Sequence, residues 1–413
     1  MGVNSNQYLQ GINQTTGTGA PTHSAVAGDR YTDTANGNTY QYTTSWQSVS
    51  YSAGGLTYFT EAQSTASPNA TVNVDSLTAV ASTTNADFVV RPKGTGAILT
   101  AIPDNAVLGG NKRGANAVDL QTIRGAADEV ASGTYSVIAG GQRNTAPNSW
   151  SAVLGGYLCS ARGDYSSNLG GYATTVTGGA AGGGGSQNQI GGTCSFSWGL
   201  TNTISANNCA AFGSSNTLSQ QWSFAGGQLH TLSSFYCTAF GQGNDASGYA
   251  NLMTGVNSKS FGVHMRQSVG GYAYTTNGDN QSSTLILSAR TTSATPKALC
   301  SADPAFLTTA NATNQLVLQN NNAMRVKGSI IAKQTGTTNV GAWDIDFVIV
   351  RGANAGTTVI VTLNVNLVTN ASSWGTPTIT ADTSIGCPTI TVTGVATTNI
   401  QWGCSIASME VIY

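Results

Sequence analysis

A glycine-punctuated repeat between residues 135 and 271 constrains the fold of this chain more than any other feature. The repeat unit is too short for a pair of helices, but it suits two short strands joined by two tight turns that use glycine where φ is positive. A repeat this short and this regular predicts a stacked β-solenoid, or β-roll. One glycine occurs at the same place in every repeat, and we call it the marker glycine. The interval between marker glycines is nearly constant and becomes one residue shorter after the third of them: Gly141, Gly156, Gly171, Gly185, Gly199, Gly213, Gly227, Gly241 and Gly255.

Two other columns of the repeat are mostly apolar and indicate the core. Five residues after the marker, eight of nine positions are apolar, so we expect this column to point inward: Ala146, Ala161, Val176, Ile190, Ile204, Leu218, Leu232, Ala246 and Ser260. A second mostly apolar column lies three residues before the marker: Ile138, Val153, Phe196, Ala210, Phe224 and Leu252.

Asparagine recurs three residues after the marker glycine. Side-chain amides at equivalent places in successive coils can bond up and down the stack as a ladder. We therefore predict a structural asparagine ladder formed by Asn144, Asn188, Asn202, Asn216 and Asn244.

One such column has a thin core, because each coil buries only two or three side chains and many of them are alanine. A lone column would also leave long strand edges and flat apolar faces in water. Association with copies of itself removes both problems, and threefold symmetry suits an elongated rod. The sequence therefore predicts an all-β, elongated trimeric fibre, that is, a homotrimer.

The composition excludes several classes of function. Charged residues make up 8% of the chain and the formal net charge is −1, which argues against binding to nucleic acid or to anionic membrane. No apolar run approaches the roughly 18 residues of a membrane helix, so no membrane insertion is expected. Seven scattered cysteines and three histidines form no metal-binding or disulfide pattern, and we expect no cofactor and no metal.

Several stretches of the chain resemble known fibre families. The unit from Gly241 to Gly248, GQGNDASG, and the looser unit from Gly141 to Ala146, GQRNTA, resemble the repeats of trimeric YadA-like adhesin heads. The run GGNKRGANAVDLQ at 109–121, followed by VASG at 130–133, resembles phage tail-fibre proteins that carry these repeats. The stretch 287–413 is similar to the terminal domain of such fibres. The chain departs from the repeat at 182–185 and where bulky residues replace the first glycine: Trp198, Phe212 and Phe240.

The resemblance implies a virion protein of the phage tail. The first residues carry neither the basic nor the apolar part of a signal peptide, which disfavours a bacterial surface adhesin and favours assembly in the host cytoplasm. The expected location is a tail appendage. A head fibre or capsid decoration protein and a polysaccharide-degrading tailspike are the alternatives.

Four regions are expected along the chain. Residues 1–60 form an N-terminal virion-attachment region with a small hairpin at Asn36 and Gly37, in which Tyr31 and Tyr40 face each other. Residues 61–105 form a shaft or collar, and residues 106–271 form the glycine-rich solenoid. Apolar and polar residues alternate in eight or nine segments of residues 272–413, which predicts a C-terminal antiparallel β-sandwich tip.

Carboxylate pairs that could cleave a glycosidic bond are scarce. Asp164 and Asp245 lie six coils apart, which is roughly 29 Å at the spacing of paired strands. Asp344 and Asp346 share one face of a strand, but a solvated face paired with Arg325 or Arg351 is the simpler interpretation. We therefore expect a protein without catalysis.

Binding is the expected role of the C-terminal region. Trp374 follows a short polar stretch, and its indole could stack on a sugar face or pack against the neighbouring chain. The candidate receptor-binding residues are Asn370, Ser372, Ser373 and Trp374. The expected partners are a tail or baseplate protein at the N-terminus and a host surface glycan or outer-membrane protein at the C-terminus.

Overall fold

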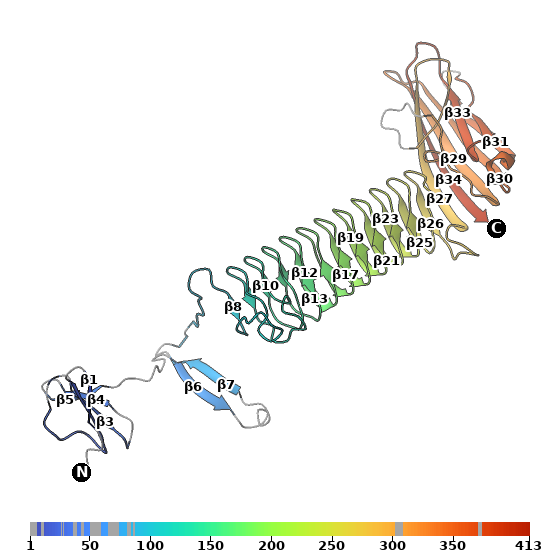
Figure 1. Ribbon diagram of the computed structural model, residues 1–413. Helices are drawn as coiled ribbons and strands as arrows, with labels where there is room; N and C mark the ends of the chain where they lie inside the picture. Colours follow the sequence, from blue (N-terminus) through green and yellow to red (C-terminus); the bar gives the residue numbers. More distant parts are fainter. Residues whose placement is uncertain are drawn as a thin grey trace. The chain divides into compact units, whose positions relative to one another are not determined.

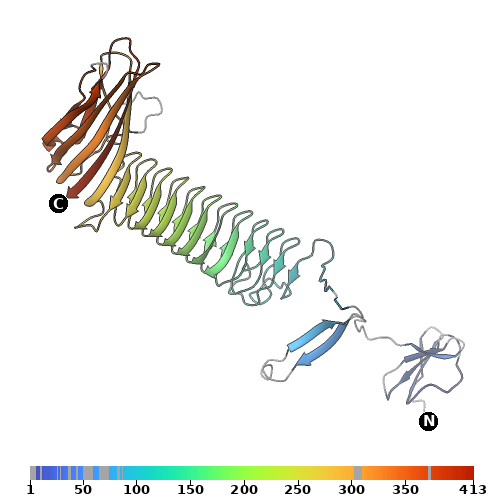
Figure 2. The same cartoon turned by 180° about the vertical axis from the view of Figure 1, so that it is seen from behind.

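The computed structural model consists of two compact units, Met1–Arg91 and Pro92–Tyr413 (Figures 1 and 2). It describes residues 6–9, 12–25, 27, 29–35, 39–42, 45–49, 59–64, 74–80, 84–85, 87–301, 309–370 and 374–413. Among these residues the single helical turn is η1 (Ala355–Thr357), and the part of the chain that is described contains no helix long and apolar enough to cross a membrane.

The N-terminal unit holds a five-stranded sheet and a separate hairpin. The sheet has the order β1-β2-β3-β4-β5, with β2 and β3 parallel and the other neighbours antiparallel. Tyr31 and Tyr40 are direct cross-strand partners, as predicted, whereas the turn at Asn36 and Gly37 lies outside the described residues. The strands are β1 (Asn6–Leu9), β2 (Ile12–Gly17), β3 (Arg30–Asp33), β4 (Thr39–Tyr42) and β5 (Trp46–Val49), with the hairpin formed by β6 (Phe59–Ser64) and β7 (Val74–Ala79).

The solenoid is built from two parallel ladders, and the predicted stack of short repeats, one per turn, is confirmed. Each residue of one coil pairs with its equivalent in the next, as in Phe196, Ala210 and Phe224. The first sheet contains β8 (Ile98–Leu99), β9 (Val118–Asp119), β10 (Val137–Ile138), β11 (Ala152–Val153), β13 (Ser167–Tyr172), β15 (Gly182–Ser186), β17 (Phe196–Leu200), β19 (Ala210–Ser214), β21 (Phe224–Gln228), β23 (Thr238–Gln242), β25 (Leu252–Gly255) and β26 (Gln267–Gly270). The second sheet contains β12 (Ser160–Ala161), β14 (Thr175–Val176), β16 (Gln189–Ile190), β18 (Thr203–Ile204), β20 (Thr217–Leu218), β22 (Thr231–Leu232) and β24 (Asp245–Ala246).

Marker glycines are required by the close approach of successive coils. Gly213 has a φ of +111°, and a Cβ there would lie 1.9 Å from the carbonyl oxygen of Gly227 in the next coil. Glycine is not needed at the corners, however. Thr201 and Asn208 adopt the left-handed region with φ of 53° and 57°, and non-glycine residues hold these corners in most coils.

The column five residues after the marker points inward and is buried throughout, as predicted. The column three residues before the marker is buried only in the longer, earlier coils, at Ile138 and Val153. The register shifts after Asn168, where the repeat becomes one residue shorter. The residue that is lost lies between the inward-pointing strand position and the marker glycine, so this position falls two residues before the marker in the later coils instead of three. The prediction was therefore wrong for the later coils, in which Ser197, Ala211, Ala225, Ala239 and Met253 fill the core and the residue before each of them points outward.

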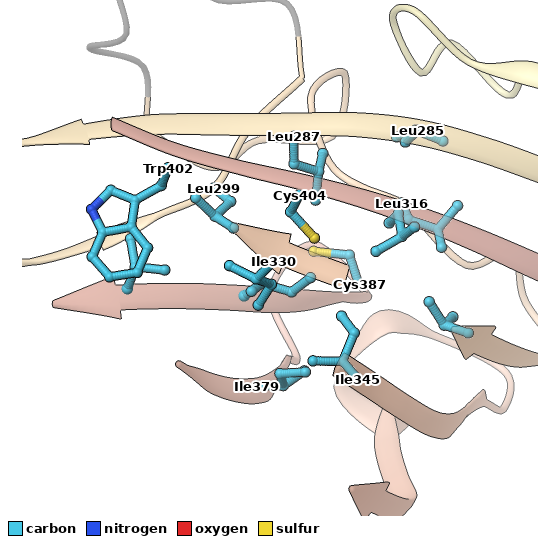
Figure 3. Packing of buried hydrophobic residues seen from close by; sticks show 14 of the residues in the cluster. Leu285, Leu287, Leu299, Leu316, Ile330, Ile345, Ile379, Cys387, Trp402 and Cys404 are labelled. Carbon is cyan, nitrogen blue, oxygen red and sulfur yellow. The ribbon is translucent and has the colours of Figure 1, made fainter. Parts of the chain in front are cut away.

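The C-terminal strands are antiparallel, as predicted. A large sheet has the order β27-β34-β29-β30-β31 and a small sheet the order β28-β33-β32. The core between them holds Cys387, Cys404 and Trp402 (Figure 3). The indole of Trp402 stacks on that of Trp343 in the same core. The strands are β27 (Asn280–Thr291), β28 (Pro296–Ala298), β29 (Asn322–Gln334), β30 (Val340–Arg351), β31 (Val359–Asn370), β32 (Thr378–Asp382), β33 (Cys387–Thr393) and β34 (Ile400–Ile412).

The first sheet of the solenoid continues into the large sheet of the sandwich. Strand β26 pairs in parallel with β25 on one side and antiparallel with β27 on the other (Figure 1). Backbone hydrogen bonds therefore run without interruption from the solenoid into the C-terminal strands, which joins the two regions rigidly.

Candidate functional site

The predicted receptor-binding indole lies inside its own subunit. Trp374 is 5% exposed, and its ring centroid is 6.0 Å from that of Trp402 in the sandwich core. The Asn370 side chain accepts a hydrogen bond from the Trp374 N–H at 2.9 Å and donates one to its carbonyl oxygen at 2.7 Å. A buried indole offers no face to a sugar or to a neighbouring chain, which corrects the expectation for Trp374. Ser372 and Ser373 lie outside the described residues.

The carboxylates of the sandwich are paired with neighbouring strands. Asp346 binds Arg325 Nη2 at 2.9 Å and Lys327 Nζ at 3.6 Å, and the Arg325 hydrogen bond lowers the pKa of Asp346 below its usual value. Asp344 accepts a hydrogen bond from Ser329 Oγ at 2.7 Å. This is the solvated, ion-paired strand face that the sequence suggested, with Arg325 and not Arg351 as the partner.

The two acidic residues of the solenoid have separate local partners. Asp164 accepts hydrogen bonds from the Ser149 N–H at 3.2 Å and from Asn148 Nδ2 at 3.3 Å. Asp245 pairs with Lys259 at 3.3 Å. No cluster of three or more metal-ligating side chains occurs among the residues that the structure describes.

The asparagine column is buried and bonded along the stack. Each Oδ1 accepts the backbone N–H of the equivalent residue one coil later, at 2.9 Å from Asn202 to Asn188 and 3.0 Å from Asn216 to Asn202. Each Nδ2 donates to the marker glycine carbonyl of the next coil, as Asn188 does to Gly199 at 2.8 Å. Asn144 and Asn244 make the same contacts with their own neighbours. The column therefore has a structural role and presents no group to a ligand.

An aromatic strip covers the outer face of the first sheet. Trp198, Phe212 and Phe240 are 47%, 41% and 46% exposed, and the half-buried rings of Phe196 and Phe224 lie between them with centroids 5.4–5.9 Å apart. The rings fit over glycines of adjacent coils, since a Cβ on Gly184 would lie 2.6 Å from the Trp198 ring. Contiguous exposed apolar surface of this kind marks an interaction face. We call these five residues the aromatic strip.

Strand β31 offers a second unpartnered apolar surface. It ends the large sheet, and no strand in the described part of the chain pairs with its outer edge. Its twelve residues include no charge, and Val361, Leu363 and Leu367 are exposed. Long uncharged edge strands are prone to pair with other chains.

The outer face of the second sheet is polar in the same coils. Its outward column contains Thr175, Gln189, Thr203, Thr217 and Thr231. The solenoid therefore has one apolar and one hydroxyl-rich face, a difference that the sequence analysis missed because it placed Phe196 and Phe224 in the core column. The shortening of the repeat by one residue after Gly171 was the signal that could have revealed it.

Exposed aromatic stacks also occur at one corner of the solenoid. Trp150 stacks on Tyr165 with centroids 4.8 Å apart, and Tyr135 lies on its other side at 5.9 Å. Trp222 and Tyr236 form a second stack at 4.9 Å. All five residues have positive φ, so the corner backbone directs them outward in register.

No protein family and no curated protein matches the chain. Among solved structures it is similar to a tailspike protein, gp49 of the Acinetobacter baumannii bacteriophage Fri1, a capsular polysaccharide depolymerase. The match has 7% sequence identity and a TM-score of 0.22, and it covers 86% of this chain and 76% of the tailspike. The strand pairing makes the chain a β-solenoid protein; its likeness to a phage tailspike is distant and carries no information on its activity.

Proposed function

We propose that the protein is a homotrimeric phage virion fibre that recognises the host surface without catalysis. In this proposal the N-terminal unit attaches to a tail or baseplate protein, and the C-terminal sandwich contacts a host glycan or outer-membrane protein. The fibre is a tail appendage assembled in the host cytoplasm.

The aromatic strip is the observation that carries this proposal. Each coil of the solenoid buries only a few side chains, such as Ala211 and Leu218, while Trp198, Phe212 and Phe240 face water. Burial of apolar surface stabilises by about 25 cal/mol per Å². Two further copies arranged around a threefold axis would cover the strip of each chain, because parallel solenoids present the same rings at the same height.

The edge of β31 supports the same assembly. Its exposed Val361, Leu363 and Leu367 add apolar surface in the sandwich to the apolar surface of the solenoid, so both regions of unit 2 offer such surface to neighbouring copies. The resemblance of residues 109–121 and 241–248 to fibre repeats supports the assignment of this assembly to a phage tail.

Adsorption measurements test the proposal. The purified protein, added in excess to host cells, should occupy the receptor and slow the attachment of particles that carry the same fibre, and it should leave the host polysaccharide intact. Unchanged attachment, or release of oligosaccharides from that polysaccharide, would contradict host recognition or the absence of catalysis respectively.

A further inference from the structure

A polar groove crosses the outer face of the second sheet at β14, β16 and β18. Its volume is about 420 Å³, within the range of about 300–1,000 Å³ that is usual for ligand sites. The residues that determine its chemistry are Thr175, Thr177, Gln187, Gln189, Thr203 and Ser205.

Gly191 contributes to the hollow. In the coils on either side the equivalent residues are Thr177 and Ser205, whose side chains lie on the outer face of the second sheet. The φ of Gly191 is not in the left-handed region, and a Cβ there would make only ordinary contacts, 3.5 Å from the Ile204 oxygen and 3.6 Å from Thr177 Oγ1. Neither the backbone nor the packing requires glycine at this position.

The groove offers free hydrogen-bonding groups and no charge. Within the described part of the chain, the side chains of Thr177, Gln187, Gln189 and Thr203 make no hydrogen bond to protein. Hydroxyls and primary amides both donate and accept hydrogen bonds, which matches a ligand rich in hydroxyl groups. Since none of the lining residues is ionisable, the groove favours a neutral ligand over an acidic one.

An aromatic residue directly precedes the first residue of the groove lining. Tyr172 is half exposed and directly precedes Ala173, which lines the groove. Tyr157 stacks on one face of its ring with centroids 5.7 Å apart, whereas its partner in the next coil is Ser186. The second face of the Tyr172 ring therefore has no aromatic neighbour in its column, as a sugar-stacking platform requires.

We propose that this groove binds a short segment of neutral glycan along the stack of coils. Successive coils are about 4.8 Å apart, so the three coils span about 10 Å, a length that accommodates two linked pyranose rings. The inference rests on the proposed host-recognition function and adds, to the contact made by the C-terminal sandwich, a glycan site on the flank of the solenoid. The groove lies on the sheet opposite the aromatic strip, so formation of a trimer through the strip leaves it open.

Glycan binding by the full-length protein tests the inference. An array of neutral and acidic oligosaccharides identifies the preferred sugar, and calorimetry then compares Gly191→Gln, which fills the hollow, with Ser233→Gln, which places the same side chain in the same column three coils away. We expect a neutral oligosaccharide to bind the wild type, Gly191→Gln to weaken binding at least tenfold, Tyr172→Ser to weaken it severalfold, and Ser233→Gln to leave it unchanged.

Three results would overturn the proposal: no binding of any neutral glycan, a preference for acidic glycans, or equal affinity of the Gly191→Gln and wild-type proteins. A parallel adsorption assay separates this inference from the proposed function. If Gly191→Gln still competes for host cells as the wild type does, the groove is not the receptor site although host recognition stands.

Discussion

Arg266 and Glu410 form a fully buried ion pair although they are 144 residues apart in the sequence. Arg266 directly precedes β26 at the end of the solenoid, and Glu410 lies on β34 of the sandwich. The Glu410 carboxylate also accepts hydrogen bonds from Gln281 Nε2 at 3.1 Å and Ser408 Oγ at 2.7 Å. The charges of Arg266 and Glu410 therefore compensate each other, and the pair fixes the last coil against the C-terminal sheet.

Replacement of Glu410 by alanine should strongly destabilise the C-terminal unit. Removal of one partner leaves the Arg266 charge buried and unpaired, which typically costs about 3–5 kcal/mol. The midpoint of urea unfolding, followed by tryptophan fluorescence at fixed protein concentration, should fall clearly. Asp346→Asn, which breaks the exposed pair with Arg325, is the control and should leave the midpoint nearly unchanged. Similar midpoints for the two variants would show that the junction does not depend on the buried pair.

A comparison of two glycines should separate backbone strain from close packing. Gly213 and Gly262 both have positive φ, of +111° and +77°, but only Gly213 lies against the next coil, since nothing is within 4 Å of a Cβ on Gly262. Gly262→Ala should cost about 1–2 kcal/mol from its φ alone. Gly213→Ala should cost clearly more, measured as a larger drop in melting temperature, because the new Cβ overlaps a backbone carbonyl. Equal losses would mean that adjacent coils separate easily.

Acid should weaken the solenoid through His230. This residue replaces asparagine in the buried ladder: its Nδ1 accepts the Asn244 N–H at 3.2 Å, and its Nε2 lies 3.2 Å from the Gly226 oxygen. Burial lowers the pKa of His230, so the unfolded chain binds the proton more readily. Its contribution to stability is complete above the ordinary value of 6.5 and is lost as the pH falls from there towards the folded pKa.

The variant His230→Asn should therefore reduce the loss of melting temperature between pH 7.5 and 5. His264, whose pKa burial also lowers, remains in both proteins and supplies the residual dependence. The same pH dependence in wild type and variant would exclude His230 as the responsible group.

Thiol labelling should report the burial of the cysteines. Cys194 is exposed at a solenoid corner, and the other six cysteines are buried. Burial raises the pKa of the Cys387 and Cys404 thiols to about 12, which suppresses the reactive thiolate. A maleimide at pH 7 should modify one thiol per native chain, and Cys194→Ser should abolish labelling. Rapid modification of several thiols would indicate a much looser core.

The solenoid and the C-terminal strands could be predicted because their signals are local. The spacing of the glycines predicted the coils, and the alternation of apolar and polar residues predicted the strands β27, β29, β30, β31 and β34. Residues 315–319 alternate in sequence as a strand does but form none, although Leu316 and Leu318 are buried. The alternation of apolar and polar residues indicates which side chains enter a core, but it does not indicate whether the backbone of that segment pairs with another strand.

The functional surfaces were harder to predict because they depend on register. The repeat loses one residue between the inward column and the marker glycine after Asn168, so a count from the marker placed Phe196 and Phe224 in the core, whereas they face outward in the aromatic strip. Trp374 follows a polar stretch that suggested exposure, yet the indole packs against Trp402, which is distant in sequence. The groove depends on Gly191, one glycine among many, and it emerges only when the neighbouring coils are aligned.

The central claim is that the aromatic strip is covered by copies of the same chain. Sedimentation equilibrium of the purified protein tests it most directly, together with the triple variant Trp198→Ser, Phe212→Ser and Phe240→Ser. We predict three times the chain mass for the wild type and a concentration-dependent shift towards single chains for the variant. A wild-type protein that remains a folded, stable monomer at all concentrations would contradict the account.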